Sequence, residues 1–141
     1  MIEATALAAV FLLTVAGVIH AFWAFGGVWP ARDGRTLAKA VTGEKQEHMP
    51  NMAACLMVFV LLAAAAIIVS DRAGLVDLPG PGWVVTAGAW VVVGALAARG
   101  LLGFVTSLWA RRATRYHQLD VAIYSPLCLV IVALCLPAAL R

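Results

Sequence analysis

The chain has 141 residues, of which 64% are hydrophobic and only 12% are charged, and its mean hydropathy is +0.97. A water-soluble globule of this size has too much surface for its core to bury so many apolar side chains. The composition therefore excludes an ordinary soluble domain and favours a protein that lies in a lipid bilayer. The net charge of +3 is small and gives no nucleic-acid signature, so no nucleic-acid partner is expected.

The apolar residues form long continuous blocks, each sufficient for a helix across the roughly 30 Å hydrocarbon core of a bilayer. Continuous blocks favour helices over barrel strands, which alternate polar and apolar residues over about ten positions. The blocks predict an all-α fold, a polytopic four-transmembrane-helix antiparallel bundle that forms a single transmembrane domain over residues 1–141. The predicted helices lie at about 4–25, 50–70, 83–109 and 119–140.

The first block, about Ala4–Phe25, is expected to remain as a membrane helix, because it is longer than the usual 7–15-residue core of a signal peptide and no Lys or Arg precedes it. His20 lies near its end, with Trp23 on the same helical face. A lone histidine there either forms an interhelical hydrogen bond or lines a binding pocket, and Trp23 equally suits an interfacial aromatic belt. Gly26 and Gly27 are expected to end the helix.

The connections between the blocks differ in charge. The second connection, Asp71–Gly82, is rich in turn formers and predicts a tight hairpin. The first is longer, and residues 35–47 could form a short interfacial helix with Leu37 and Val41 one turn apart. By the positive-inside rule both termini are expected outside the cytoplasm, with contact between the basic side and anionic lipids. The basic residues of the first and third connections are Arg32, Arg35, Lys39, Lys45, Arg111, Arg112 and Arg115.

Arg99 is the one full charge inside the third block. It lies about 5 Å from the middle of the block, so its side chain would have to reach roughly 10 Å to the headgroups, which is long even for arginine. We therefore expect it to face the bundle, where a small residue such as Gly103 lets a neighbouring helix approach and supply an acceptor. Arg99 would then either tie helices together or line a polar cavity that binds a ligand.

The fourth block places Asp120, Tyr124 and Cys128 on one side of a helix. Asp120 is expected to cap the helix N-terminus, with a place in the cavity as the alternative. Pro126 removes an N–H and frees the carbonyl of Ala122, which predicts a local kink. Tyr124 could donate to that carbonyl or direct its hydroxyl into the cavity.

Two short motifs resemble those of a known family. The first helix ends with His20-Ala21-Phe22-Trp23 and Gly26-Gly27-Val28-Trp29-Pro30, and the last begins with Tyr124-Ser125-Pro126-Leu127-Cys128. Together they resemble a family of small bacterial four-helix membrane proteins catalogued only as a domain of unknown function. The resemblance implies this fold over essentially the whole chain, in a bacterial inner membrane, and it implies no activity.

The motif-bearing helix ends and Arg99 converge on the predicted cytoplasmic half of the bundle. A polar pocket there, formed by His20, Trp23, Arg99, Asp120 and Tyr124, would bind or transport a lipid or a small hydrophobic or anionic molecule. One alternative is an intramembrane enzyme that acts on a lipid or isoprenoid, with His20 or Asp120 as acid or base. Another is an accessory or structural membrane subunit.

Several other chemistries are disfavoured. No cofactor and no metal site are expected, because the cysteines form no C-x-x-C pair and the candidate ligands Glu47 and His48 are adjacent in a predicted loop. A proton-coupled exporter of cations needs a carboxylate embedded in the membrane, whereas Glu3 and Asp120 lie at predicted helix ends. Small residues such as Gly17 allow a homodimer as readily as packing within the chain.

Overall fold

Long helices make up most of the chain. The computed structural model describes all residues except 44–47 and 111–113, and within the described residues every regular element is helical. Four of these segments are long and apolar enough to cross a membrane, which confirms the predicted all-α, four-span fold. Lys45, Arg111 and Arg112 of the predicted topology signal lie outside the described residues, as does the end of the predicted interfacial helix.

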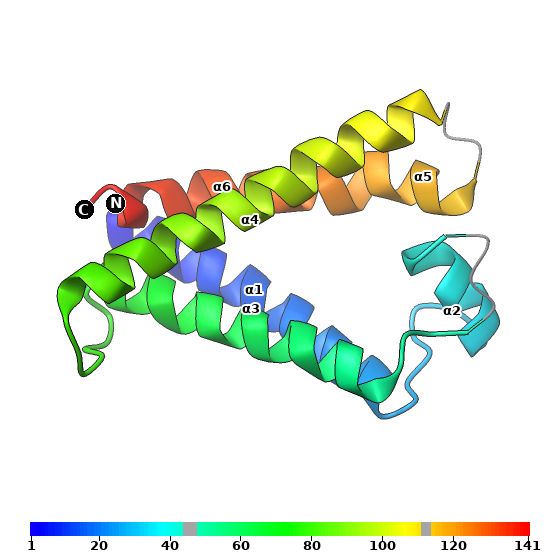
Figure 1. The fold of residues 1–141 in the computed structure, drawn as a ribbon, viewed down its shortest axis with the longest axis horizontal. Coiled ribbons are helices and arrows are strands. Elements are labelled where there is room, and N and C mark those ends of the chain that lie inside the picture. The colour runs from blue at the N-terminus through cyan, green and yellow to red at the C-terminus, as the bar shows by residue number, and fades with distance from the viewer. Residues whose placement is uncertain (44–47, 111–113) are drawn as a thin grey trace.

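Three of the spans are single α-helices, and the fourth is composite (Figure 1). The first three begin and end close to the predicted bounds, whereas the fourth begins at Arg115 and not near residue 119. A short helix also lies in the first connection. The elements are α1 (Ile2–Ala24), α2 (Gly34–Val41), α3 (Met52–Arg72), α4 (Gly82–Trp109), α5 (Arg115–Leu119), the π-helical turn η1 (Asp120–Tyr124) and α6 (Ser125–Ala139).

The double glycine ends α1, as predicted. Gly26 adopts a φ of 86°, a conformation that glycine reaches without a steric cost. The N–H of Gly27 then donates to the carbonyl of Phe22 at 2.9 Å, which satisfies one of the free carbonyls at the helix end. A Cβ atom on Gly27 would collide with the Phe22 ring. The turn can therefore fold this closely onto α1 only because residue 27 has no side chain.

The ends of α3 are fixed by two polar side chains. Asn51 caps the beginning, because its side-chain oxygen accepts the N–H of Ala54 at 2.8 Å. At the other end the helix continues through Asp71 and Arg72, two residues beyond the predicted bound of about residue 70. The carboxylate of Asp71 accepts the N–H of Leu78 at 2.7 Å and thereby holds the short connection to α4 in place. The predicted tight hairpin is thus organised by the last turn of α3.

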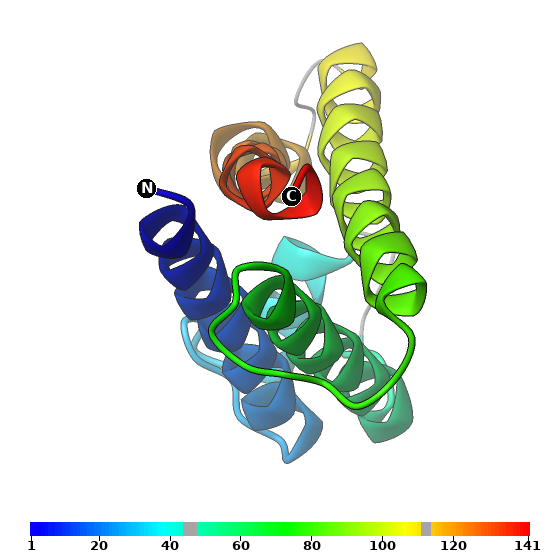
Figure 2. The ribbon, with the colours of Figure 1, turned by 90° about the vertical axis from the view of Figure 1, so that its left-hand side faces the viewer.

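The four spans form an antiparallel bundle in which α1, α3, α4 and α6 follow one another around a common axis (Figure 2). α1 and α3 pack together as one arm, and α4 packs with the composite fourth span as a second arm. Both termini lie at one end, called here the terminal end. The opposite, basic end carries α2 and α5, and the two arms diverge toward it (Figure 1).

The apolar core between the arms lies in the terminal half of the bundle. Most of its members are small, so the helix backbones approach closely. Gly17, slightly beyond this core, packs within the chain against Phe59 and Leu62 of α3. Toward the basic end no such core joins the arms within the described residues. The buried members are Ala6, Ala9, Leu13, Ala65, Ala66, Val69, Ala73, Ala89, Val93, Ile131, Cys135, Ala138 and Ala139.

Helix α2 bridges the two arms at the basic end. It begins at Asp33, whose carboxylate accepts the N–H of Thr36 at 2.8 Å, and it buries Leu37 and Ala38 on one face. Although the chain joins α2 to α1 and α3, its contacts with other helices are with α5 in the second arm. The predicted interfacial helix is therefore present, but it is shorter than 35–47 and packs on protein.

Candidate functional site

A buried carboxylate organises the polar interior of the second arm. Asp120 is fully buried, and its Oδ1 accepts from Arg99 Nη2 at 2.9 Å and from Ser125 Oγ at 3.2 Å. Its Oδ2 accepts from Ser107 Oγ at 2.7 Å, and Ser107 and Ser125 are themselves fully buried. We call these four residues the Asp120 cluster. Its charge-assisted hydrogen bonds offset the cost of burying the carboxylate and join α4 to the fourth span.

The contribution of α4 to this cluster follows from its helical spacing. Arg99, Gly103 and Ser107 are four residues apart and therefore lie along one face of the helix. A Cβ on Gly103 would overlap the Arg99 guanidinium and would lie 2.6 Å from Ser125 Oγ and 2.9 Å from Asp120 Oδ2. Gly103 thus provides the space in which the carboxylate approaches. The expected role of a small residue beside Arg99 is confirmed.

The expectation that Asp120 caps a helix is wrong. The fourth span begins at Arg115, and its N-terminal cap is Thr114, whose hydroxyl oxygen accepts the N–H of His117 at 3.3 Å. The polar residues from Arg115 onward continue the helix outward beyond the apolar block. Asp120 consequently lies inside the span, where its side chain meets α4 and not the free amides of a helix end.

A π-helical turn explains how Ser125 reaches Asp120. Residues 120–124 are π-helical, and the backbone N–H of Ser125 donates to the carbonyl of Asp120. In a π-helix residues five positions apart are aligned, so the Ser125 side chain lies beside that of Asp120. A local kink was predicted from Pro126; what the structure has near the proline is this π turn, which ends at Tyr124. Such turns are frequent at functional sites.

Arg99 belongs to this cluster and is also accessible. Its side chain is 42% exposed, in contrast to the fully buried Asp120 to which it is bonded. Within the described residues only Nη2 of the guanidinium forms a hydrogen bond, so the group keeps further donors for another acceptor. Cys128 of α6 lies within electrostatic range of the guanidinium. The cluster therefore combines a helix-joining ion pair with an accessible donor.

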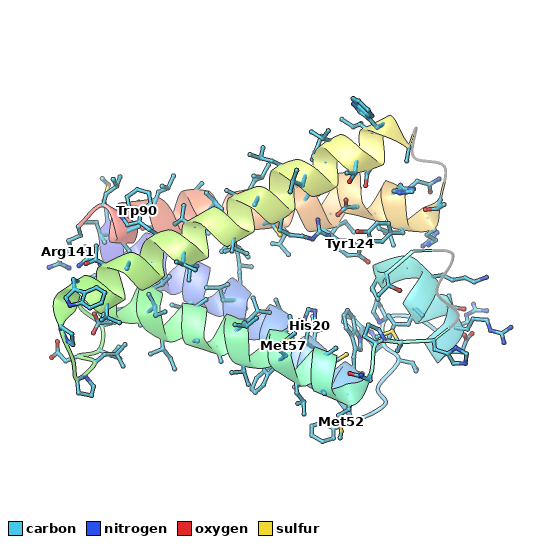
Figure 3. All side chains as sticks on the ribbon, viewed as in Figure 1. His20, Met52, Met57, Trp90, Tyr124 and Arg141 are labelled. Atoms are coloured by element: carbon cyan, nitrogen blue, oxygen red, sulfur yellow. The ribbon has the colours of Figure 1, made fainter. Side chains whose placement is uncertain are left out.

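Tyr124 joins the second arm to α2. Its hydroxyl donates to the carbonyl of Ala40 at 3.3 Å, and not to the carbonyl of Ala122 as one of the sequence alternatives had it. In Figure 3 Tyr124 from the fourth span and His20 from α1 both lie in the space between the arms. Tyr124 is thus close to the Asp120 cluster in sequence, but its hydroxyl forms a hydrogen bond with α2.

His20 and Trp23 pair with each other on the first arm. Their ring centroids are 5.1 Å apart, and the Trp23 indole donates to the carbonyl of Trp29 at 2.8 Å. His20 Nδ1 lies 2.8 Å from the carbonyl oxygen of Ala16. Because a carbonyl only accepts, Nδ1 carries a proton, and Nε2 of the neutral ring is an acceptor. Neither hydrogen bond is interhelical.

The five predicted pocket residues therefore form two groups. Arg99 and Asp120 are bonded directly, with Tyr124 in the next helical turn, while His20 and Trp23 lie on the other arm. Among the described residues no hydrogen bond or ion pair joins the groups. Sequence reasoning missed Ser107 and Ser125, although the four-residue spacing from Arg99 to Ser107 was visible in the sequence.

A cavity of about 400 Å³ lies at the basic end of the first arm. Of the five predicted residues it includes Trp23 and none of the others. Within the described residues no group of three or more His, Cys, Asp and Glu side chains is placed to hold a metal ion. The cavity is lined by Trp23, Gly26, Gly27, Val28, Gly34, Arg35, His48 and Met49.

The position of Asp120 also bears on cation export, which was disfavoured because Asp120 was expected at a helix end. The carboxylate is instead buried inside the fourth span. The membrane-embedded carboxylate that such transporters require is thus present. However, it accepts three hydrogen bonds, one of them from an arginine, so it is not a free site for a cation.

These features define a small four-span helical membrane protein in whose second arm a partly exposed arginine pairs with a buried aspartate. The chain belongs to the family described as "protein of unknown function (DUF3995)", whose model matches residues 5–135. The match covers α2, the whole Asp120 cluster and all of the apolar core except Ala138 and Ala139. No curated protein and no solved structure matches the chain significantly.

Proposed function

We propose that the protein binds a lipid or another hydrophobic molecule with an uncharged polar head, between the two arms at the level of the Asp120 cluster. The observation that carries this proposal is the state of Arg99, which is paired with a buried carboxylate and yet 42% exposed. A charged side chain at membrane depth costs several kcal/mol unless it is paired or solvated by polar groups. A polar ligand would satisfy the exposed donors.

The position of Arg99 relative to α6 supports a site between the arms. Ile131 and Cys135 belong to the core that α6 shares with the first arm. Cys128 precedes them on the same face of α6, nearer the basic end, and it lies within electrostatic range of Arg99. The exposed part of the guanidinium is therefore expected to face the first arm and not the lipid outside.

The ion pair also limits the class of ligand. Because Asp120 already balances the charge of Arg99, a fully anionic head would gain less at this site than at an unpaired arginine. The remaining guanidinium donors suit a carbonyl, ester or hydroxyl oxygen. On the opposite arm His20 Nε2 offers an acceptor, so a hydroxyl could interact with both groups.

We further infer that the basic end faces the cytoplasm of a bacterium and that both termini lie outside. The described cations of the two basic connections, Arg32, Arg35, Lys39 and Arg115, support this orientation by the positive-inside rule. The ligand would then occupy the cytoplasmic half of the bundle.

The decisive experiment compares ligands retained by the purified protein in native mass spectrometry. An Arg99→Gln and Asp120→Asn double variant removes both charges together, so no unpaired charge remains buried. We expect it to fold and to lose a lipid-sized adduct that the wild type retains. Arg141→Gln is the control, because this arginine also forms a hydrogen bond, in its case to the backbone carbonyl of Ala73, but lies at the terminal end.

Two results would contradict the proposal. One is an adduct that the double variant retains as well as the wild type does. The other is a wild type that retains no adduct when it is extracted under mild conditions from its own membrane. In the second case the cluster serves only to join α4 to the fourth span, as an accessory or structural subunit would require; the complete satisfaction of the Asp120 carboxylate favours this alternative.

A further inference from the structure

The cavity at the basic end lies just outside the membrane-spanning segments of the first arm. Its lining comes from the end of α1, the turn that follows it, the beginning of α2 and the residues before α3. With 23 residues α1 extends over about 34 Å, close to the thickness of the hydrocarbon core. The cavity is therefore expected at the depth of the lipid headgroups on the basic side.

Three of the lining residues of this cavity are glycines, Gly26, Gly27 and Gly34. A Cβ atom on Gly26 or Gly34 would meet no other atom within 4 Å, so both positions border empty space. Trp23 provides an aromatic wall, and its indole N–H is already bonded to Trp29. The volume of about 400 Å³ lies within the range of about 300–1,000 Å³ that is usual for small-molecule sites.

Arg35 gives the cavity a positive charge, and His48 adds an imidazole ring. Arg35 and His48 both line the cavity and are exposed. Within the described residues the only ion pair is Arg99 with Asp120, so Arg35 has no carboxylate at ion-pair distance there. The neighbouring Asp33 lies within electrostatic range of Arg35 but does not line the cavity, and its oxygens accept from the amide and hydroxyl of Thr36 at 2.8 and 3.0 Å.

We propose that this cavity binds a phosphate group at the membrane surface, and that Arg35 and His48 hold the phosphate oxygens. Guanidinium donors match phosphate oxygens in geometry and charge, and histidine adds a donor in its protonated form. The headgroup of an anionic lipid and phosphate from solution share this chemistry. The site is separate from the Asp120 cluster, and its ligand is anionic, whereas the ligand proposed there is not.

The test uses the full chain, delipidated in detergent, with two probes. Phosphatidic acid in phosphatidylcholine vesicles presents a lipid phosphate, and inorganic phosphate presents the free anion. Arg35→Gln is expected to lower retention of phosphatidic acid about tenfold, since charge-assisted hydrogen bonds are strong ones. The matched control is Lys39→Gln, which removes an equal charge from an exposed position of the same helix that does not line the cavity.

A second variant tests the free volume of the cavity and leaves the charge of Arg35 unchanged. Gly34 lines the cavity and a Cβ atom there would meet no atom within 4 Å, so Gly34→Leu adds bulk at the lining without altering the Arg35 or His48 side chains. It is expected to abolish retention of phosphatidic acid while the protein stays folded. The Arg99→Gln and Asp120→Asn double variant is expected to retain phosphatidic acid like the wild type, which separates this site from the proposed one.

The outcomes distinguish the sources of phosphate. Retention of phosphatidic acid over phosphatidylcholine, dependent on Arg35 and Gly34, supports a lipid headgroup. Binding of inorganic phosphate alone, with the same dependence, supports the site and assigns it to free phosphate. Equal losses with Arg35→Gln and Lys39→Gln overturn the proposal, because they indicate diffuse attraction to a basic surface. Binding of neither probe also overturns it.

Discussion

Arg99 and Asp120 are 21 residues apart in sequence, and the Nη2 of one lies 2.9 Å from the Oδ1 of the other. The pair connects the middle of α4 with the π turn of the fourth span. Two buried hydroxyls, those of Ser107 and Ser125, complete the coordination of the carboxylate. A pair of this kind is sensitive to the loss of one partner and less sensitive to the loss of both.

Removal of Arg99 alone is expected to destabilise the protein strongly. Arg99→Ala leaves the buried Asp120 carboxylate without its counter-charge; a fully buried pair costs about 3–5 kcal/mol to break, and the 42% exposure of Arg99 puts the expected loss at the lower end of this range. The Arg99→Gln and Asp120→Asn double variant should recover most of this loss. Thermal unfolding in detergent, followed by circular dichroism, measures both. A double variant no more stable than Arg99→Ala would show that the charges are not coupled.

Gly103→Ala is expected to disturb the Asp120 cluster. Its methyl group would overlap the Arg99 guanidinium and lie 2.6 Å from Ser125 Oγ, so the second arm must shift at a cost of about 1–3 kcal/mol. Gly94→Ala on the same helix is the control, because no atom lies within 4 Å of its Cβ position. The control should stabilise α4 by roughly 0.5–1 kcal/mol through helix propensity. Equal melting temperatures for the two variants would contradict this packing.

Loss of the Tyr124 hydroxyl is expected to loosen α2. Tyr124→Phe removes the hydrogen bond to the Ala40 carbonyl, worth about 0.5–1.5 kcal/mol, and keeps the ring. Amide hydrogen exchange in α2 should then accelerate about threefold to tenfold, while exchange in α1 stays unchanged. Tyr116→Phe, which alters the other tyrosine, serves as the control. Unchanged exchange in α2 would show that α2 is held by its apolar face alone.

The cap of α2 predicts a specific pH dependence. The Thr36 backbone N–H, and then its hydroxyl, stabilise the ionised Asp33 carboxylate and hold its pKa below the usual value of 3.8. The stabilisation of α2 by this cap is therefore complete above pH 3.8 and is lost as the pH falls through the lowered pKa. Titration of the Asp33 carboxyl resonance by NMR measures the pKa directly. A midpoint at or above 3.8 would contradict the cap.

Asp33→Asn provides the matched variant for this titration. Asparagine also caps helices well, through an uncharged side-chain oxygen that does not titrate. The amide resonance of Thr36 should therefore move with pH in the wild type and remain constant in Asp33→Asn. A pH-dependent shift of similar size in both proteins would assign the effect to another group.

The sequence alone determined the number and approximate position of the spans, because a hydrocarbon core of fixed thickness requires long uninterrupted apolar helices. It also determined that Gly26 and Gly27 end α1 and that Arg99 has an acceptor on a neighbouring helix beside Gly103. Each of these conclusions depends on local composition and helical spacing, which are read directly from the order of residues.

Only the tertiary structure decided how Asp120 is used. The polar residues from Arg115 to Gln118 suggested a loop, so Asp120 was placed at a helix end, whereas they continue the helix and carry Asp120 inside the span. The π turn that aligns it with Ser125, the docking of α2 on the second arm and the split of the predicted pocket depend on which helix faces come together. Those contacts join residues distant in sequence, and local pattern does not specify them.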